Sequence, residues 1–471
     1  MSDNSVSVVV VGAGVAGLST AHHLRQAGFT NITILEASDR VGGRVKSVAP
    51  LEGEGAVELG ATCIHGASRD NPVYALMEET GGQFCTEEGD RIDRSVAEKV
   101  WEIYMDMADD QDEQYKMHAK EGGSCTQTMS SEKFIQKAIP RMLQAFQEGK
   151  QRTAASSALN TMLNYTRFMD GSEMNHISAD LVGCYVTPPG PEMLVTGRGY
   201  SLFVENLVKQ IPGVNILFNR EVTKIRWGGV PENDHHVIGD TCSTNPKAKV
   251  LCKNGDEYDA DYVVVTCSLG HLKANHKTLF DPPLPESKAG AIERMGFGRS
   301  NKLFLYYEKP FWKEGVKLAW TTDTPNITTK SDWVRRILAF DTVPGNPHVL
   351  GGPVSGTGSE ILETLTDDQV AADCTEVLRK FLNNPSIPSP TFILRSNWNT
   401  DHLYLGSYSY LSTESKDGDI EELASSLPGD RHPVLLFAGE ATHPCYYSTV
   451  HGAYLSGVTA SKKISDAQNS K

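Results

Sequence analysis

The sequence lacks the features by which disulfide-rich, metal-binding and membrane-spanning proteins are recognised. Its nine cysteines are an odd number, widely spaced and without a Cys-x-x-Cys pair, which argues against a disulfide framework or a zinc site. No stretch reaches the roughly 18–20 apolar residues of a membrane-spanning helix, and no basic region precedes the short apolar run near the N-terminus. The closing residues QNSK match no peroxisomal or ER-retention signal. We therefore expect a protein of the reducing cytosol that binds no metal.

Positive charge is also scarce. The chain has 44 Lys and Arg residues against 59 Asp and Glu, a formal net charge of −15. This balance argues against nucleic acid and an anionic membrane as partners, because both bind basic surfaces, and it suits the attraction of cationic ligands. The 471 residues exceed one typical domain, so we expect two domains or two interleaved lobes. The sequence leaves the oligomeric state open.

A dinucleotide-binding fingerprint opens the chain. The β-branched run Val6–Val11 predicts a strand buried on both faces, and apolar residues at helical spacing continue to Gly28. A second strand, Ile32–Leu35, ends in Glu36, about 20 residues beyond the glycines, where the fingerprint requires an acid for a ribose hydroxyl. The loop between strand and helix contains Gly12, Gly14, Ala16 and Gly17.

Each glycine of this loop has a separate physical role. Gly12 allows the tight turn, Gly14 lets a pyrophosphate approach the backbone, and Gly17 lets helix and sheet pack closely. The helix N-terminus offers free N–H groups and a positive dipole end to the diphosphate. A lone G-x-G-x-x-G would be weak, but strand, helix, second strand and acid are all in place. The segment therefore predicts a dinucleotide site.

A second glycine turn follows the acid and favours FAD over NAD. In ASDRVGGRVKS, Arg40, Gly43 and Arg44 lie a few residues beyond Glu36. This suggests contacts to a further part of the same extended cofactor, with a guanidinium on a phosphate. The alternative is a surface loop with solvated arginines.

The nucleotide-binding part is expected to return in pieces along the chain. A hairpin with the turn Asn254-Gly255 leads into the apolar strand Tyr262–Val265, a meander typical of FAD-binding doubly wound domains. The closing stretch predicts a short strand, Val434–Ala438, and a helix opening at Ser448-Thr449. We therefore predict an α/β fold with two interleaved domains. The FAD-binding domain is assigned residues 1–84, 194–280 and 396–471, and the substrate domain residues 85–193 and 281–395.

Motifs spread over nearly the whole chain add up to a family pattern. They are VVVVGAGVAGLSTAHHL, ILEASDRVGGRVKS, VELGATCIHG, VVVTCSLGHLK, MGFGRSNKLFLYYEKPFW, LRSNW…GSYSY and LFAGEATHPCYYSTVHGAYLSG. In this order they resemble the flavin-dependent amine oxidases, most closely the polyamine oxidases, while residues 85–190 match least. The resemblance implies a Rossmann-like, glutathione-reductase-type FAD-binding domain interleaved with an α+β substrate domain.

The resemblance also implies which residues hold FAD, without a covalent bond. Glu36 would bind the adenosine ribose, Val222 would touch the adenine side through its backbone, and Glu440 would hydrogen-bond the ribityl-diphosphate part. The N-terminus of the last helix would stabilise negative charge on the reduced ring. Besides the two glycine turns, the other implied cofactor residues are Arg44, Gly60, Ala61, Thr62, Trp398, Thr449 and Val450.

Four residues are implied to act on the substrate. Lys302 matches the family lysine that holds a water near flavin N5; an edge-strand lysine facing solvent is the alternative, because burying an ammonium is costly. His65 matches a histidine of the polyamine oxidase cavity, against the alternative of a structural histidine. Tyr408 and Tyr447 would form aromatic walls beside the flavin that tolerate a nearby cation, against the alternative of core packing.

Two departures from the family pattern and one open question accompany these assignments. Ser407 stands where monoamine oxidases carry the cysteine bound to the flavin, so covalent attachment should be absent. Thr449 replaces a tyrosine of the aromatic cage found in many amine oxidases, which indicates a wider cavity. The acids that bind the substrate's amines remain open: Glu58, Asp170 and Glu173 are candidates, and each has a structural alternative.

The implied reaction oxidises a secondary amine of spermine, spermidine or their acetylated forms. Hydride transfer to flavin N5 and hydrolysis of the imine would give an aldehyde and a shorter amine, and molecular oxygen would be reduced to hydrogen peroxide. An amino-acid or methyl-lysine oxidase is one alternative, although no arginine clamp for a carboxylate is evident. A catalytically silent escort or scaffold protein is another, which the retention of Glu440 and Lys302 argues against. The preferred polyamine and the carbon–nitrogen bond that breaks are not determined.

Overall fold

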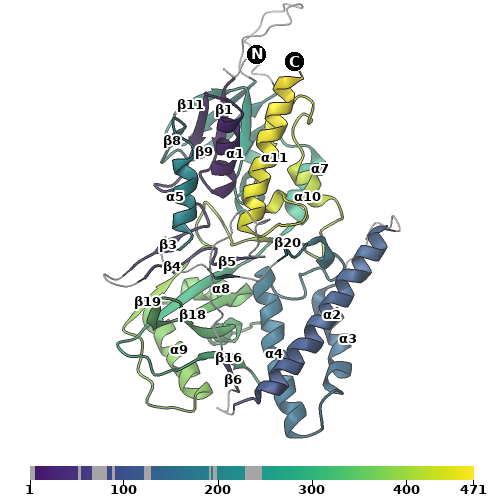
Figure 1. The fold of residues 1–471 in the computed structure, drawn as a ribbon, viewed down its shortest axis with the longest axis vertical. Helices are drawn as coiled ribbons and strands as arrows, with labels where there is room; N and C mark the ends of the chain where they lie inside the picture. The colour runs from purple at the N-terminus through teal and green to yellow at the C-terminus, as the bar shows by residue number, and fades with distance from the viewer. Residues whose placement is uncertain are drawn as a thin grey trace, which may run out of the picture.

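The chain folds into two lobes, each built on its own sheet, as a computed structural model shows (Figure 1). The upper lobe in Figure 1 holds a parallel sheet and both ends of the chain, and the lower lobe holds a mixed sheet flanked by long helices. The structure describes residues 6–50, 55–65, 82–86, 91–120, 129–189, 193–194, 199–228 and 247–470.

The upper sheet has five parallel strands in the order β21-β12-β1-β2-β8. Its central strands are continuous apolar runs because helices or strands cover both faces, and every residue of β1 and β12 is buried. The strands come from three distant parts of the chain, as predicted. They are β1 (Val8–Val11), β2 (Ile32–Leu35), β8 (Asn215–Leu217), β12 (Tyr262–Val265) and β21 (Leu435–Phe437).

Three helices cover one face of this sheet: α1 (Val15–Gln26), α5 (Ser201–Lys209) and α11 (Val450–Asn469). The first and the last helix of the chain lie side by side (Figure 1). They approach closely at Gly457, where a Cβ atom would lie 2.5 Å from the carbonyl oxygen of Ala16. The two ends of the chain thus build one layer.

An antiparallel meander and three helices cover the other face. The predicted hairpin turn is confirmed, with Gly255 at φ +91° between β10 and β11. The meander consists of β9 (Val222–Trp227), β10 (Ala248–Cys252) and β11 (Glu257–Ala260), and β13 (Phe280–Asp281) adds to β9 as a parallel strand. The helices are α6 (Leu269–Leu279), α7 (Glu286–Arg294) and α10 (Asp419–Ala424).

The lower sheet has six strands in the order β19-β15-β18-β17-β16-β6, antiparallel except for the pair β16 and β6. The boundary predicted at residue 84 falls inside β6, which pairs with this sheet. The strands are β6 (Gly82–Thr86), β15 (Ser300–Tyr306), β16 (Gly315–Ala319), β17 (Ala339–Val343), β18 (Asn346–Ser355) and β19 (Phe392–Arg395).

Two sets of helices pack around the lower sheet. On one face, η2 (Lys330–Arg336), α8 (Gly356–Thr364) and α9 (Asp367–Phe381) enclose an apolar cluster. Beside it stand α2 (Arg94–Lys120), α3 (Ser131–Leu143) and α4 (Lys150–Asp170), which share a second cluster (Figure 1). Over the described residues, no helix combines the length and apolarity needed to cross a bilayer.

Short segments lie between the two lobes, as Figure 1 shows for β3, β4, β5 and β20. They are β3 (Ser47–Val48) with β4 (Val57–Glu58), β5 (Cys63–Ile64) with β7 (Met193–Leu194), β14 (Gly296–Phe297) with β20 (Ser409–Tyr410), and the 3₁₀ turns η1 (Val182–Cys184) and η3 (Glu440–Thr442).

Candidate active site

The first glycine loop has the geometry that its sequence predicts. Gly12 adopts φ +107°, a conformation that favours glycine, and forms the turn from β1 to α1. At Gly17, a Cβ atom would lie 2.0 Å from the carbonyl oxygen of Gly12, so helix and turn touch there. At Gly14 nothing lies within 4 Å of an added Cβ, and its φ of −71° is ordinary. The open side at Gly14 fits a cofactor that lies against the backbone.

Glu36 lies at the C-terminal end of β2, directly behind this loop. Its buried carboxylate accepts hydrogen bonds from the Ala13 N–H (2.7 Å) and from the N–H and hydroxyl of Ser38 (2.8 and 2.7 Å). The backbone carbonyl of Glu36 accepts from the Arg220 N–H at 2.8 Å, and Val222, at the start of β9, follows two residues later. The structure therefore brings Glu36 and Val222 to the same edge of the sheet.

The second glycine turn packs on the first. Gly43 adopts φ +59°, and its added Cβ would lie 3.3 Å from the Cα of Gly14. The guanidinium of Arg40 donates to the carbonyls of Val41 and Val45 at 3.2 Å and to that of Gly43 at 2.5 Å. Arg40 thus holds the turn together, and its polar contacts are with this turn and the Tyr404 hydroxyl.

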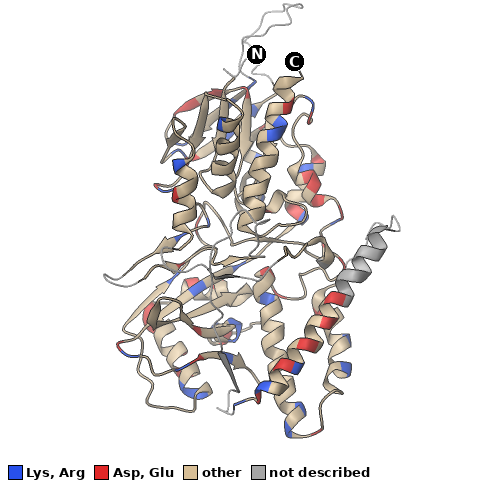
Figure 2. Ribbon diagram, viewed as in Figure 1, with Lys and Arg blue, Asp and Glu red and all other residues tan. Residues whose placement is uncertain are grey.

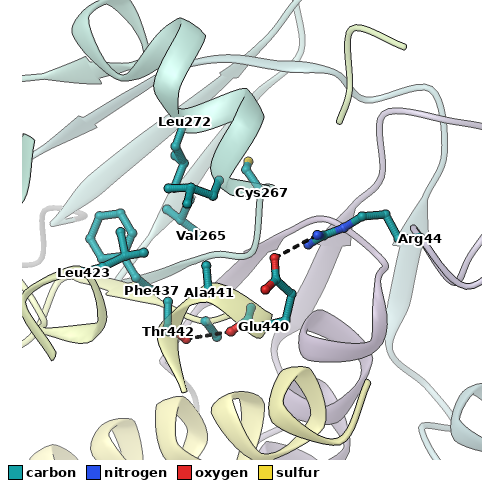
Figure 3. Close-up of a pocket in the computed structure, with 12 residues that line it drawn as sticks. Arg44, Val265, Cys267, Leu272, Leu423, Phe437, Glu440, Ala441 and Thr442 are labelled. Atoms are coloured by element: carbon teal, nitrogen blue, oxygen red, sulfur yellow. Dashed lines mark hydrogen bonds and ion pairs between the residues drawn. The ribbon is translucent and has the colours of Figure 1, made fainter. Parts of the chain in front are cut away.

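Arg44 and Glu440 join the two ends of the chain in a partly buried ion pair with a 2.8 Å separation (Figure 3). Glu440 also accepts from the Ser409 hydroxyl at 2.6 Å and the Ser448 N–H at 2.9 Å, while Arg44 donates to the Ser407 carbonyl at 2.7 Å. The pair borders a cavity with apolar walls (Figure 3). The cavity walls include Val265, Cys267, Leu272, Leu423 and Phe437.

The last helix begins just after Ser448, whose N–H donates to Glu440 of the cavity wall. Thr449 is the N-cap of α11, and its hydroxyl oxygen accepts from the Gly452 N–H at 2.9 Å, so Val450 is the first helical residue. His451 is 4% exposed, and its Nε2 has no hydrogen-bond partner among the described residues. Burial lowers the pKa of His451 to about 4, so the imidazole is neutral. His451 is not among the residues predicted from the sequence, because nothing in its spacing separates it from a structural histidine.

Lys302 reaches across from the lower sheet to the loop after β4. Its strand β15 pairs with β18 on one side and β19 on the other, so Lys302 is not the edge-strand lysine of the alternative interpretation. Its ammonium donates to the carbonyl oxygen of Gly60. Burial lowers the pKa of Lys302 to about 8, because desolvation disfavours the charged form. A cation that releases its proton near neutral pH is suited to proton transfer.

The segment 60–65, which runs from the loop that Lys302 contacts through β5, carries four of the predicted residues. At Gly60 an added Cβ would lie 1.8 Å from the Arg44 carbonyl, and the Ala61 N–H donates to that same carbonyl at 3.2 Å. Trp398 holds the loop by donating from Nε1 to the Leu59 carbonyl at 2.8 Å. The other two are Thr62, whose hydroxyl donates to the Gly60 carbonyl at 3.4 Å, and His65, half-buried with its ring 6.4 Å from that of His451.

The two predicted tyrosine walls have different surroundings. Tyr408 is half-buried, and its hydroxyl donates to the Phe168 carbonyl at the end of α4. Burial raises the pKa of Tyr408, so the phenol stays protonated. Tyr447 is 8% exposed and belongs to the apolar cluster beneath the upper sheet, edge-on to Tyr185 with centroids 5.7 Å apart. The environment of Tyr447 is that of a core residue.

The three acids considered for amine binding differ in their partners. Glu173 pairs with buried Arg336 at 2.7 Å and with Arg167 at 3.5 Å, so its charge is already compensated. Glu58 is buried and accepts hydrogen bonds from Ser47 and Tyr200. The Asp170 side chain has no polar partner in the described part of the chain, and burial raises its pKa to about 7. Of the three, Asp170 retains a carboxylate able to accept a new cation.

Comparison with known proteins identifies the family. The sequence profile of the flavin containing amine oxidoreductases matches residues 89–465, and that of the NAD(P)-binding Rossmann-like domain matches residues 10–80. The chain belongs to the flavin containing amine oxidoreductases. As a member of this family it is an FAD-dependent amine oxidoreductase.

Similar proteins agree with this assignment. The chain is 34% identical to the human peroxisomal N(1)-acetyl-spermine/spermidine oxidase, over 96% of this chain and 93% of that protein. It is 32% identical to polyamine oxidase 1 of Oryza sativa subsp. japonica, over 97% and 96% of the two chains. A solved putrescine oxidase bound to putrescine shares the fold with a TM-score of 0.69 at 17% identity, over 98% of this chain and 99% of that one.

The residues present fit FAD, the cofactor of this family. Gly14 and Gly439 both leave space beside the backbone, because nothing lies within 4 Å of an added Cβ at either. Gly439 lines the cavity beside Arg44, and Gly14 contacts the second glycine turn at Gly43. The unpartnered Nε2 of His451 lies at the start of α11. A bound polar cofactor would lie against the open backbone of the two glycines and offer a hydrogen-bond partner to the His451 nitrogen.

Proposed function

We propose that this amine oxidoreductase is a polyamine oxidase that oxidises a secondary amine of spermine, spermidine or their acetylated forms. The products would be an aldehyde, a shorter amine and hydrogen peroxide. The observation that carries the proposal is the contact of Lys302 with the Gly60 carbonyl, which sets a cation of lowered pKa beside the loop of His65. Two polyamine oxidases among the similar proteins support it.

We propose that FAD is held without a covalent bond along a track from Glu36 to the start of α11. Glu36 and Val222 would hold the adenosine end, and the glycine turns with Arg44 and Glu440 would hold the diphosphate and ribityl part. The other proposed cofactor contacts are Gly12, Gly14, Ala16, Gly17, Gly43, Gly60, Ala61, Thr62, Trp398, Thr449 and Val450. Arg40 is proposed to act through the turn that it holds, since its guanidinium bonds the carbonyls there.

Bound FAD would supply the acceptor for the hydride that leaves the carbon next to the amine. The protein's part is to orient the substrate and to manage protons. Lys302 would hold a proton or a water at the reacting amine, His65 would contact the amine chain, and Tyr408 would confine it. Asp170 would bind a distant ammonium group of the polyamine as its counter-ion. Figure 2 shows acidic positions in red along α2, and the acids Glu98, Glu102, Asp106 and Asp109 are exposed there. They would raise the local concentration of polycations.

We also propose the two-domain division predicted from the sequence, with β6 assigned to the substrate domain because it pairs with β16. A cytosolic location remains a proposal, since the human relative is named as peroxisomal. Fractionation of cells that produce the full chain would test it: recovery with peroxisomes would contradict the cytosolic assignment.

The function is tested by measuring peroxide released by the purified, FAD-loaded protein. We expect turnover with spermine, N-acetylspermine or spermidine, and little with benzylamine, an L-amino acid or a methyl-lysine peptide. Preference for the amino acid or the methyl-lysine peptide would overturn the substrate class. A protein without flavin absorption in the visible range would overturn the oxidase assignment itself.

Acid precipitation should release the flavin into the supernatant, because Ser407 has no thiol with which to form a thioether. The Ser407 hydroxyl instead donates to the Gly298 carbonyl at 2.9 Å. Absorbance at visible wavelengths in supernatant and pellet measures the outcome. A pellet that stays yellow would contradict non-covalent binding.

Asp170→Asn should raise KM for spermine roughly tenfold, the effect of losing an ion pair worth about 1.4 kcal/mol. Because burial raises the pKa of Asp170 to about 7, the carboxylate is charged above that pH. The wild-type KM should therefore rise as the pH falls through 7, whereas the KM of Asp170→Asn should stay flat in this range. Steady-state kinetics between pH 6 and 8 measure both. Glu376→Gln, an exposed acid on α9, is the matched control; equal KM profiles for wild type and Asp170→Asn would exclude this anchor.

A further inference from the structure

A buried acid lies under the loop that Lys302 contacts. Glu58, the last residue of β4, is 6% exposed. The Ser47 hydroxyl lies 2.8 and 2.9 Å from its two carboxylate oxygens, and the Tyr200 N–H donates to one of them at 3.0 Å. Gly199 lets the backbone come this close, because it adopts φ +70° and an added Cβ would lie 1.8 Å from the same oxygen. The chain is built to enclose this carboxylate.

The same arrangement fixes the acceptor of Lys302. Tyr200 also donates from its hydroxyl to the Cys63 carbonyl at 2.7 Å. Glu58 and Cys63 bound the short segment whose Gly60 carbonyl accepts from the Lys302 ammonium. Both ends of the segment are therefore tied to Tyr200, one of them through the carboxylate of Glu58.

Lys302 has no ion pair within the part of the chain that the structure describes. Besides burial, two ionisable groups act on its pKa and both raise it, Cys63 more strongly and then Glu58. On the neighbouring strand β19, Arg395 donates to two backbone carbonyls at the end of α8 and pairs with Asp367. On the other side, β18 places Pro353 opposite Lys302. Of the two ionisable groups, Glu58 is the carboxylate, and its bonds to Ser47 and Tyr200 also hold the loop that Lys302 contacts.

We propose that Glu58 is a positioning residue for Lys302: its carboxylate is the countercharge that keeps the ammonium protonated, and it holds the loop whose Gly60 carbonyl the ammonium binds. Glu58 is thereby assigned a task different from binding the substrate's amines. Without it, less charge opposes the desolvation of Lys302, and the proton leaves at a lower pH. The inference rests on the proposed function only where it concerns catalysis by Lys302; the protonation of Lys302 is independent of that function.

The test measures the protonation of Lys302 without using turnover. The free energy of unfolding of the FAD-loaded protein is measured by urea titration between pH 6 and 10.5, for wild type and Lys302→Met. The pKa of Lys302 is about 8 in the folded chain, below its ordinary value of 10.5. The unfolded state therefore binds more protons in this window, and the wild-type stability should rise with pH relative to Lys302→Met.

The comparison is then repeated in the Glu58→Gln background, with Lys302 present and with Lys302→Met. Glu58→Gln keeps an oxygen acceptor for Ser47 and Tyr200 and removes the charge. In Glu58→Gln we expect the rise of unfolding free energy with pH to begin about one pH unit lower than in wild type. One nearby opposite charge gives a pKa shift of this size. Glu58→Asp should move the onset back toward the wild-type value. An onset unchanged by Glu58→Gln overturns the proposal. If Glu58→Gln does not fold, Ser47→Ala should lower the onset by a smaller amount, and an unchanged onset there overturns it equally.

A kinetic measurement separates this inference from the proposed function. The pH profile of flavin reduction by spermine should lose its Lys302-dependent inflection in Lys302→Met and shift it to lower pH in Glu58→Gln. If Lys302→Met is reduced at the wild-type rate, the catalytic role of Lys302 fails. The unfolding comparison still decides whether Glu58 sets the charge of Lys302.

Discussion

Lys302→Met should slow flavin reduction by spermine about 100-fold while FAD remains bound. Positioned proton transfer contributes roughly 10²–10⁴-fold to enzymatic rates, and Lys302 is the group of lowered pKa at the loop of His65. Met fills a similar volume but holds neither a proton nor a water. Stopped-flow absorbance after anaerobic mixing measures the rate, and the visible spectrum before mixing measures the bound flavin.

Two control variants separate this role from a general effect on the fold. Lys302→Arg keeps a cation that cannot release its proton near neutral pH, so it should remain slow although the charge is restored. Lys273→Met removes another lysine whose pKa burial lowers, one that donates to the carbonyls of Ile292 and Met295 at the end of α7. Its reduction rate should equal that of wild type. A wild-type rate in Lys302→Met would refute the assigned role.

Gly14→Val should fold normally and lose FAD. The backbone of Gly14 has φ −71°, which any residue adopts, and nothing in the protein lies within 4 Å of its Cβ direction. The added side chain would clash with the cofactor and with no part of the protein, because a diphosphate must lie against this backbone. We expect FAD affinity to fall about 100-fold, equivalent to about 2.8 kcal/mol, as measured by titrating apoprotein with FAD.

Gly17→Ala, three residues away, should lower the stability of the fold itself. Its Cβ would lie 2.0 Å from the Gly12 carbonyl oxygen, so the backbone itself must move. Overpacking of this kind costs about 1–3 kcal/mol of unfolding free energy. Thermal unfolding should therefore show a lowered midpoint for Gly17→Ala and a normal one for apo Gly14→Val. The reverse pattern would contradict the assignment of Gly14 to the cofactor and Gly17 to packing.

Local sequence determined the parts of the fold in which neighbours in the chain are neighbours in space. The run Val8–Val11, the glycine loop and the strand Ile32–Leu35 were readable because one βαβ unit contains its own hydrophobic pattern and its own turn. The capped start of α11 was readable for the same reason: Thr449 precedes the helix and bonds the N–H three residues on.

The identity of the charged groups that remain free was decided by tertiary structure. Glu58, Asp170 and Glu173 are equivalent acids in the sequence, yet Glu173 meets two arginines from other elements and Glu58 meets Ser47 and Tyr200. Arg40 likewise turned inward to the carbonyls of its own turn. No local pattern encodes the partners Tyr200 of Glu58 and Arg336 of Glu173, because they are 142 and 163 residues away. The carbonyl partners of Arg40 lie within five residues, but whether its side chain turns to them or to solvent depends on the packing around the turn.

The sequence by itself therefore determined the nucleotide-binding unit, the family and the chemistry expected of it. Only the tertiary structure decided that Arg44 pairs with Glu440 across 396 residues, that Lys302 binds the Gly60 carbonyl, and that Tyr447 lies in the core. The physical reason is that periodicity and turn chemistry act over a few residues. Charge compensation and burial depend on whichever distant segments the fold brings together.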